Sequence, residues 1–307
     1  MKAVVLPRYG GARDLESTDV PRPPCGPNEV LIRLKATSVN PVDRHLGAGG
    51  LDSLVPVQFP LIPGWDAAGT VVEVGAEITE YTVGDDVLGH VRRPVAKWGT
   101  YAEYTTAEPF MIAPKPASMD WHSAAGLPLA GLTALQALDA VAVKDAETVL
   151  VHAAAGGVGS IAVQIAAARG ARVIGTASPR NHDYLVALGA EPVEYGDGLL
   201  ERVRRLVPDG IDAALDAVGA GEFDLSAGAG ADPSRIVSIA DPKVRERGGV
   251  HVFTEPDSGD LRALTTLVES RELTVPVSAV YPLEEAAKAW EAGRGGHARG
   301  KIILTIA

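Results

Sequence analysis

The residues with the clearest chemical capacity form a glycine-rich stretch, VHAAAGGVGSIAVQ, at positions 151–164. Its pattern, Ala154-x-Gly156-x-x-Gly159, matches the dinucleotide fingerprint G-x-G-x-x-G except that alanine replaces the first glycine. Glycine at the second position lets the backbone approach a pyrophosphate, and glycine at the third lets a helix lie close to a strand. A simple tight turn is the alternative, because glycine runs also mark turns.

The segments on both sides of this stretch are those that the fingerprint requires. Before it, TVLVHA (148–153) is typical of a short buried strand, and after it apolar residues recur at helical spacing from Val158 to Ala168. A second strand-like run, ARVIGT (171–176), follows. The start of the helix would offer N–H groups and the positive end of its dipole to phosphates. We therefore predict a dinucleotide site formed by Ala155, Gly156, Gly157, Val158 and Gly159.

The residues after the second strand favour NADPH over NADH. An NAD site usually places Asp or Glu on the ribose about 20 residues beyond the first fingerprint position. The corresponding segment, GTASPRNHDY, has no acid before Asp183 and contains Thr176, Ser178 and Arg180 instead. A hydroxyl and a guanidinium suit a 2′-phosphate, which accepts charge-assisted hydrogen bonds. The alternative for Arg180 is a solvated surface arginine.

Length and composition limit the class of protein. A chain of 307 residues exceeds the usual size of one domain, so we expect two. The formal net charge of -11 argues against a general affinity for nucleic acid or anionic membrane surfaces. Without a run of 18 apolar residues, no membrane span is predicted. The apolar run at the amino end is too short for a secretory signal, so we expect a cytoplasmic protein.

The chain contains two kinds of region that differ in sequence pattern, which we call the first and second textures. Residues 1–125 contain short alternating runs such as EVLIRLKATSV (29–39), separated by glycine and proline, which predicts antiparallel strands curling into a barrel. In residues 126–275 strands alternate with helices, which predicts a parallel sheet; the strands expected there are 148–153, 171–176, 211–217 and 235–240. Residues 276–307 return to the first texture, so we assign them to the first domain. The Gly/Ala-rich segment 220–235 predicts a short or loose helix.

In its motifs the chain resembles the zinc-free, quinone oxidoreductase-like branch of the medium-chain dehydrogenase/reductase superfamily. The matching motifs are SVNPVD (38–43), PLIPGWDAAGTVVEVG (60–75), GDDVLG (84–89), LPLAGLTALQAL (127–138), VLVHAAAGGVGSIAVQIA (149–166), VIGTASPRNHDYLVALGA (173–190) and GHARGKIIL (296–304). The resemblance implies an α/β fold with two domains. These are a GroES-like β-barrel catalytic domain at 1–125 and 276–307, and a Rossmann NADP-binding domain, a doubly wound parallel sheet, at 126–275.

Metal ligands are missing at the positions where zinc-dependent members of the superfamily have them. Those members use a cysteine in the segment matching ATSVNPVD and a histidine in the element matching GWD, where this chain has Asn40 and Trp65. The single Cys25 also rules out a four-cysteine zinc lobe. We therefore expect no metal. The acceptor is then expected to be a quinone or an α,β-unsaturated carbonyl, because a simple ketone needs a Lewis acid to stabilise its alkoxide.

The candidate catalytic residues are Asn40, Asp43 and Thr133. Asn40 could donate a hydrogen bond to the developing oxyanion, although Asn-Pro also starts turns. Asp43 could hold the loop or cap a helix, and capping is the expectation we favour. Thr133 matches a residue that the family places beside the nicotinamide, and a buried helix threonine is the alternative. The residues expected to line the acceptor pocket are Tyr9, Leu46 and Trp65.

Further cofactor contacts follow from the resemblance alone. It places Tyr195 near the adenosine phosphate, where a core aromatic is the alternative, and the backbone of Ile239 and Ala240 beside the nicotinamide ribose. The segment from His251 to Phe253 resembles the strand that runs beside the nicotinamide and toward a dimer partner, so a homodimer is expected. The remaining expected contacts are Arg299 and Lys301, with solvated charges as the alternative. Arg92 and Arg93 lie on an expected loop that could attract an anionic substrate, and ordinary surface charge is the default for them.

Three functions fit these observations. The first is an NADPH-dependent oxidoreductase that transfers hydride to a quinone or enone. The second is a pathway-specific enoyl reductase or a family member repurposed for non-redox chemistry. The third is an NADPH-binding protein with a regulatory or structural role.

Overall fold

The computed structural model describes residues 1–294 and 299–307, and the chain divides into two compact units. The first unit comprises Met1–Leu129, Glu255–Glu269 and Val275–Ala307. The second unit comprises Ala130–Thr254 and Ser270–Thr274. The second unit lies within residues 126–275, where strands alternate with helices.

Helix α8 (Ser258–Glu269) is grouped with the first unit, while the strands directly before it belong to the second. It packs against β9 (Ile112–Pro114), and its Leu261 and Leu264 are fully buried. The sequence places this helix directly after the last strand of the second unit. The unit to which this helix belongs depends on the surface that buries its apolar face. An amphipathic pattern predicts that one face is buried but does not predict which surface covers it.

The first unit is built on a seven-stranded sheet with the order β16-β17-β3-β5-β6-β9, in which β8 also pairs with β3. The strands are β3 (Val30–Val39), β5 (Asp66–Val74), β6 (Asp86–His90), β8 (Tyr104–Ala107), β9, β16 (Val277–Pro282) and β17 (Lys301–Thr305). Neighbours pair antiparallel except β16 and β17, which are parallel. Two small sheets complete the unit: β1 (Lys2–Val5) with β2 (Glu16–Asp19), and β4 (Val57–Ile62) with β7 (Ala96–Trp98).

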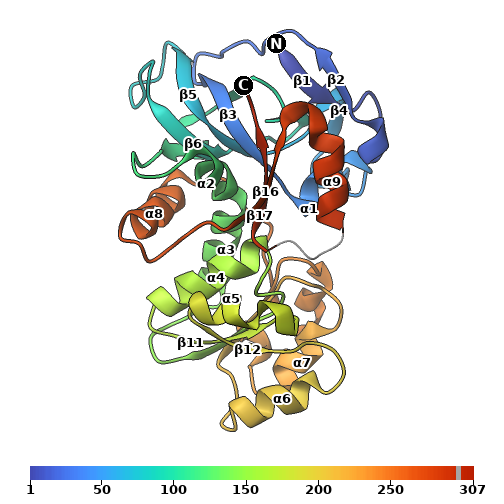
Figure 1. Cartoon of the computed structure of the whole chain (residues 1–307), viewed down its shortest axis with the longest axis vertical. Helices are drawn as coiled ribbons and strands as arrows, with labels where there is room; N and C mark the ends of the chain where they lie inside the picture. Colours follow the sequence, from blue (N-terminus) through green and yellow to red (C-terminus); the bar gives the residue numbers. More distant parts are fainter. Residues whose placement is uncertain (295–298) are drawn as a thin grey trace. The chain divides into compact units, whose positions relative to one another are not determined.

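Strand β3 is the centre of this unit. Its residues are buried along nearly the whole length, because β5, β8 and β17 pair with it and helices α2 (Trp121–Gly126) and α9 (Ala286–Arg294) pack on it. Residues 283–294 form a 3-10 turn at Leu283–Glu285 followed by α9. Figure 1 shows α9 next to α1 (Pro41–Gly47), which follows β3.

The second unit is a six-stranded parallel sheet with the order β12-β11-β10-β13-β14-β15. The strands are β10 (Thr148–Val151), β11 (Arg172–Thr176), β12 (Ala190–Val193), β13 (Ala213–Asp216), β14 (Ile236–Ser238) and β15 (Val250–His251). Numbered from β10, this is the order 3-2-1-4-5-6 of a doubly wound dinucleotide-binding sheet, in which ligands bind at the carboxyl ends of the strands.

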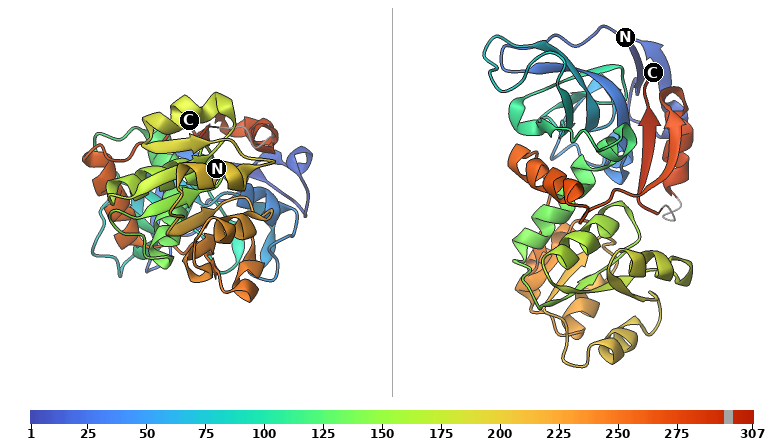
Figure 2. Two further views of the ribbon diagram at one scale, coloured as in Figure 1. Left: turned by 90° about the horizontal axis from the view of Figure 1, so that it is seen from below. Right: turned by 60° about the vertical axis from the view of Figure 1, so that its left-hand side comes forward.

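Helices flank this sheet, as the alternating pattern predicts (Figures 1 and 2). They are α4 (Gly157–Ala168), α5 (His182–Ala187), α6 (Leu199–Leu206) and α7 (Glu222–Gly228). Helix α7, in the Gly/Ala-rich segment, is short as expected, but it is not loose. Its Phe223 is buried in a core cluster with Leu150, Ile174 and Val203, and Leu225 of the same helix packs against that cluster.

Candidate active site

The glycine-rich turn joins β10 to α4 in the way that a phosphate-binding turn requires. Gly156 precedes the first turn of α4 with extended backbone, and Ala153 has a φ of 52°, in the left-handed region. A Cβ added to Gly159 would lie 2.4 Å from the carbonyl oxygen of Ala153 and 2.7 Å from Cα of Ala154. Because α4 lies this close to the turn, the first N–H groups of the helix are directed at the carboxyl edge of the sheet.

Thr176, the last residue of β11, holds this turn in place. Its Oγ1 accepts a hydrogen bond from the N–H of Ala153 at 3.0 Å, and its carbonyl oxygen accepts one from the N–H of Ala154 at 3.0 Å. The side chain is buried. The residue expected among the cofactor contacts therefore also fixes the backbone that would receive the diphosphate.

The residues expected at the 2′-phosphate and near the adenosine phosphate follow two neighbouring strands at one edge of the sheet. Thr176 and Val193 are register partners at the ends of β11 and β12, so Ser178 and Tyr195 each follow their strand by two residues at the same edge. Ser178 is half-buried, Arg180 is exposed, and Tyr195 is 54% exposed. Tyr195 is therefore not a core aromatic.

Arg202 organises the loop that carries Tyr195, and the sequence did not single it out. Its guanidinium, projecting from α6, donates to the carbonyl oxygens of Glu194 at 3.0 Å and Asp197 at 2.8 Å, and to those of Tyr195 and Gly196 at 3.3 Å. Four carbonyl groups thus share one cation, which gives this exposed loop a defined backbone.

The residues expected near the nicotinamide follow the strands on the other side of β10. Ile239, just beyond β14, donates its N–H to the carbonyl oxygen of Asp216 at 3.0 Å, and Ala240 is exposed. His251 ends β15 and is half-buried, and burial followed by the nearby Arg245 lowers its pKa. Phe253 is half-buried beyond it.

Thr133, the expected neighbour of the nicotinamide, is buried on α3 (Pro128–Ala140). Its Oγ1 lies 2.6 Å from Oγ1 of Thr254. His152, which directly follows β10, is also buried, and its Nε2 lies 3.0 Å from Oγ of Ser226. Burial lowers the pKa of His152 to about 4, although the carboxylate of Asp216 acts in the opposite direction. His152 is therefore neutral at physiological pH.

The first unit contains a buried polar group that we call the Asp66 cluster, formed by Ser38, Asn40, Asp66 and Lys301. Oδ2 of Asp66 accepts from Ser38 Oγ and from Asn40 Nδ2, the latter at 2.8 Å. Oδ1 of Asp66 accepts from the N–H of Leu129 at 2.7 Å. The ammonium of Lys301 donates to Oδ1 of Asn40 and lies 3.8 Å from Oδ2 of Asp66. All four side chains are at most 4% exposed.

Asn40 is held at both ends of its amide. Besides its bonds to Asp66 and Lys301, Nδ2 makes a longer contact of 3.3 Å with Ser38 Oγ. A substrate oxyanion could accept from this amide only in place of one of those acceptors. In this structure the side chain orients its neighbours.

Lys301 has a position that the sequence did not indicate. We expected a cofactor contact or a solvated charge, and the ammonium is buried at the start of β17 within the Asp66 cluster. Burial lowers the pKa of Lys301, and the carboxylates of Asp66 and Asp43 act in the opposite direction. The solvated-charge alternative is wrong for Lys301, whereas Arg299 is exposed. Residues 296–298 of the motif GHARGKIIL lie outside the described residues.

Asp43 joins α1 to two large aromatic residues. Its Oδ2 accepts from the N–H of Asn40 at 2.8 Å and from the hydroxyl of Tyr101 at 3.0 Å, and this hydroxyl accepts from Nε1 of Trp290 at 3.0 Å. Asp43 thus bonds the start of α1, the helix-holding role that we favoured for it. Burial raises the pKa of Asp43 to about 7, although both hydrogen bonds act in the opposite direction.

Asp43→Asn is expected to change how stability depends on pH. The folded protein holds the Asp43 proton more tightly than the unfolded chain, so the stability contributed by this proton is complete below about pH 4 and is lost as the pH rises to about 7. In that window the free energy of unfolding should fall by up to about 1.4 kcal/mol per pH unit more steeply in the unaltered protein than in the variant. Urea unfolding at several pH values measures this difference. Asp209→Asn, at an exposed carboxyl, is the control and should follow the unaltered protein.

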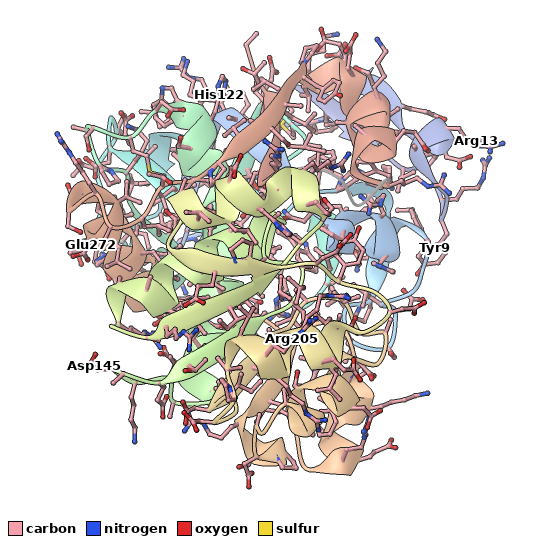
Figure 3. All side chains as sticks on the ribbon, turned by 60° about the horizontal axis from the view of Figure 1, so that its bottom comes forward. Tyr9, Arg13, His122, Asp145, Arg205 and Glu272 are labelled. Carbon is pink, nitrogen blue, oxygen red and sulfur yellow. The ribbon has the colours of Figure 1, made fainter. Side chains whose placement is uncertain are left out.

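The residues expected to line the acceptor pocket differ in exposure. Tyr9 lies at the surface (Figure 3), is 39% exposed, and donates its hydroxyl to Asp52, while its ring meets Phe59 edge to face at 4.8 Å. Leu46 and Trp65 are buried, with 1% and 5% exposed. Of the three side chains, Tyr9 alone offers a polar group at the surface.

The two arginines expected on a loop are both paired within the first unit. Arg92 forms an ion pair with Glu255. Arg93 forms one with Glu29 at 2.5 Å and also donates to the carbonyl oxygen of Thr106 at 3.0 Å. These carboxylates offset the positive charge, which weakens the case for attraction of an anionic substrate.

The donor set of the Asp66 cluster does not fit zinc. Both oxygens of Asp66 accept hydrogen bonds, and an ammonium lies beside the carboxylate where a metal cation would be repelled. Trp65 and Asn40 supply neither thiolate nor imidazole. Across residues 1–294 and 299–307, no three His, Cys, Asp or Glu residues gather closely enough to hold a metal ion. In the same described part of the chain, no helix is long and apolar enough to cross a membrane.

Comparison with known proteins agrees with this architecture. Residues 26–117 match the family model described as "Alcohol dehydrogenase GroES-like domain", and residues 188–304 match the one described as "Zinc-binding dehydrogenase". A chloroplast envelope quinone oxidoreductase homolog of Arabidopsis thaliana is 32% identical, covering 96% of this chain and 95% of that protein. An NADPH-dependent alkenal/one oxidoreductase, chloroplastic, of the same plant is 31% identical, covering 99% and 79%.

A solved structure of the quinone oxidoreductase from Coxiella burnetii superposes with a TM-score of 0.89 at 33% identity, covering 100% of this chain and 99% of that one. The chain therefore belongs to the quinone oxidoreductase-like branch of the medium-chain dehydrogenase/reductase superfamily, and it is an NAD(P)-dependent oxidoreductase. The expected family and the α/β fold with GroES-like and Rossmann parts are confirmed.

Proposed function

We propose that the protein is a zinc-independent, NADPH-dependent reductase of quinones and α,β-unsaturated carbonyls. The observation that carries the cofactor half is the turn at Gly156 and Gly159, where the absence of side chains opens backbone N–H groups to a diphosphate. The acceptor class is supported by the named relatives, one a quinone oxidoreductase homolog and the other an alkenal/one oxidoreductase. Reduction without zinc is supported by the Asp66 cluster, in which hydrogen bonds and the ammonium of Lys301 occupy both oxygens of Asp66.

The bound NADPH would supply the hydride, and the residues of the chain would bind and orient it. The start of α4 would hold the diphosphate, Ser178 and Arg180 would hold the 2′-phosphate, and Tyr195 would lie near the adenosine phosphate. Ile239, Ala240, His251 and Phe253 would meet the nicotinamide half, with Thr133 beside it. A quinone or enone suits such a site because the negative charge left by hydride attack delocalises onto oxygen.

Asn40 remains our candidate donor to that oxygen. Its contact with Ser38 Oγ, at 3.3 Å, is longer and weaker than its contact with Asp66, so one amide hydrogen is the more readily redirected. The lining of the acceptor pocket is proposed to include Tyr9, Leu46 and Trp65. A homodimer in the cytoplasm completes the proposal and depends on the family resemblance and on the composition of the chain.

Arg180→Ala is expected to weaken NADPH binding selectively. A charged hydrogen bond to the 2′-phosphate contributes about 1.5–3 kcal/mol, which corresponds to a loss of roughly 10- to 100-fold in affinity, while NADH has no such phosphate and should bind as before. Titration calorimetry with both cofactors measures the two affinities. The control is Arg205→Ala on the surface of α6 (Figure 3), which should change neither. Equal losses for NADPH and NADH would contradict the assignment of Arg180.

The proposed activity is tested by following the absorbance of NADPH with a panel of acceptors. We expect oxidation of NADPH with 1,4-benzoquinone or with a simple enone, and none with a simple saturated ketone. Oxidation only with an enoyl thioester would instead support a pathway-specific enoyl reductase. Tight NADPH binding without turnover on any acceptor would overturn the proposal in favour of a repurposed member or a regulatory or structural NADPH-binding protein.

A further inference from the structure

The geometry points to Asp216 and Ser238 as a positioning pair that shapes the surface for the nicotinamide half of the dinucleotide. Neither residue contacts the cofactor in this inference. Both act through the two loops that follow β13 and β14. The inference rests on the proposed function, since it requires that a dinucleotide binds at this sheet edge.

Asp216 holds the first of these loops. It is the last residue of β13 and is 1% exposed. Its Oδ1 accepts from the N–H of Val218 at 2.7 Å and from that of Gly219 at 2.9 Å. Because two consecutive N–H groups of the loop converge on one carboxylate oxygen, the chain is turned sharply at Gly219, whose φ is 86°.

Ser238 holds the second loop and connects it to the first. It is the last residue of β14, is fully buried, and is the register partner of Asp216. Its hydroxyl donates to Oδ2 of Asp216 at 2.7 Å and accepts from the N–H groups of Ala240 at 3.2 Å and Asp241 at 2.9 Å. The hydroxyl of Ser238 therefore links the buried carboxylate of Asp216 to the loop that follows β14.

Other hydrogen bonds also hold these loops: the N–H of Ile239 donates to the carbonyl oxygen of Asp216 at 3.0 Å, and that of Ala220 donates to Oε2 of Glu222 at 2.7 Å. Val218 is 46% exposed and Ala240 is exposed, so these two side chains do not anchor their loops by burial. Hydrogen bonds to a carboxylate are stronger than those between neutral groups. The Asp216–Ser238 pair thus holds four N–H groups of the two loops, those of Val218, Gly219, Ala240 and Asp241.

The strand order assigns these loops to one half of the ligand. In the order β12-β11-β10-β13-β14-β15, the residues proposed for the 2′-phosphate and the adenosine phosphate follow β11 and β12, and the diphosphate turn follows β10. A dinucleotide that crosses this edge at the switch point therefore places its nicotinamide half at the ends of β13 and β14. The pair should affect that half of the ligand and not the adenosine half.

The test compares two ligands on the whole protein, NADPH and adenosine 2′,5′-bisphosphate, which lacks the nicotinamide half. Ser238→Ala is expected to weaken NADPH about tenfold in titration calorimetry and to leave the affinity for the bisphosphate unchanged. Asp216→Asn keeps an oxygen for the first loop but loses an acceptor for Ser238, so it should give the same pattern. The double variant should lose less than the product of the two single losses, because both break one connection.

Two control variants separate positioning from general loosening. Thr176→Val removes the acceptor for Ala153 at the diphosphate turn, so it should weaken both ligands. Ser226→Ala removes a fully buried hydroxyl bonded to His152 and to the carbonyl oxygen of Glu222, so it should lower stability without changing the ratio of the two affinities.

The outcomes are distinct. Equal losses for the two ligands in Ser238→Ala, or no loss for either, would overturn the inference while leaving the cofactor proposal intact. If Ser238→Ala does not fold, Asp216→Asn decides by the same comparison. Failure of the unaltered protein to bind either ligand would overturn the proposed function itself.

Discussion

Gly159→Ala is expected to destabilise the second unit strongly and to abolish tight dinucleotide binding. The new Cβ would lie 2.4 Å from the carbonyl oxygen of Ala153, 3.0 Å from its carbonyl carbon and 2.7 Å from Cα of Ala154. All three atoms belong to the backbone, so no side chain can rotate away. Alanine gains about 1 kcal/mol over glycine in helix propensity, but overpacking of this kind typically costs about 1–3 kcal/mol or more. The cost of the clash should exceed the gain in helix propensity, so the substitution should lower the free energy of unfolding.

The effect on binding should exceed the effect on stability. To relieve the clash, α4 must move away from the turn, and its first N–H groups then no longer converge on the diphosphate. We expect a loss of roughly 100-fold or more in NADPH affinity, since several charged hydrogen bonds are affected together. Urea unfolding and titration calorimetry measure the two effects separately.

Gly156→Ala is the matched control. Gly156 has a negative φ of -77°, and an added Cβ would lie 3.3 Å from the carbonyl oxygen of Ala153, a contact that small shifts relieve. Its stability should stay close to that of the unaltered protein, while the methyl group weakens NADPH binding by occupying the approach to the backbone. The explanation fails if Gly159→Ala is as stable as Gly156→Ala.

Lys301→Met should produce the second large effect, a loss of about 3 kcal/mol or more in the free energy of unfolding. The ammonium is 4% exposed and its partner Asp66 is fully buried, so removing the cation leaves a carboxylate without charge compensation in the interior. The hydrogen bonds from Ser38, Asn40 and Leu129 to Asp66 do not replace that charge. Methionine keeps the length of the apolar stem, so packing changes little.

A double-mutant cycle isolates the charge effect. Lys301→Met combined with Asp66→Asn removes both charges and should recover a large part of the loss, since a neutral pair needs no compensation. The control is Arg22→Met at the surface pair with Glu73, whose side chains are 45% and 52% exposed and 2.7 Å apart. This pair should contribute less than about 1 kcal/mol. Equal losses in the free energy of unfolding for Lys301→Met and Arg22→Met would contradict the explanation that burial makes the Lys301 charge important.

The cofactor half of the site could be predicted from the sequence because its signals are local. Gly156 and Gly159 are three residues apart between a strand and a helix, and each is required by backbone geometry within that short segment. Strands β10, β11, β13 and β14 were predicted from runs of apolar residues because both faces of a parallel sheet are covered, whereas β12 was not predicted. The absence of thiol and imidazole at Asn40 and Trp65 was also visible, since ligand chemistry is a property of residue type.

Tertiary structure alone decided the partners of the buried polar residues. Asn40 and Lys301, which are 261 positions apart, meet because β17 pairs with β3, and nothing in either local sequence shows that pairing. Lysine is usually a surface residue, but Lys301 lies in the core. Asp216 and Ser238 become partners only because the register of β13 and β14 places them side by side. Residue type states which hydrogen bonds a side chain can make. Burial determines which of them it must make, and burial depends on elements brought together from distant parts of the chain.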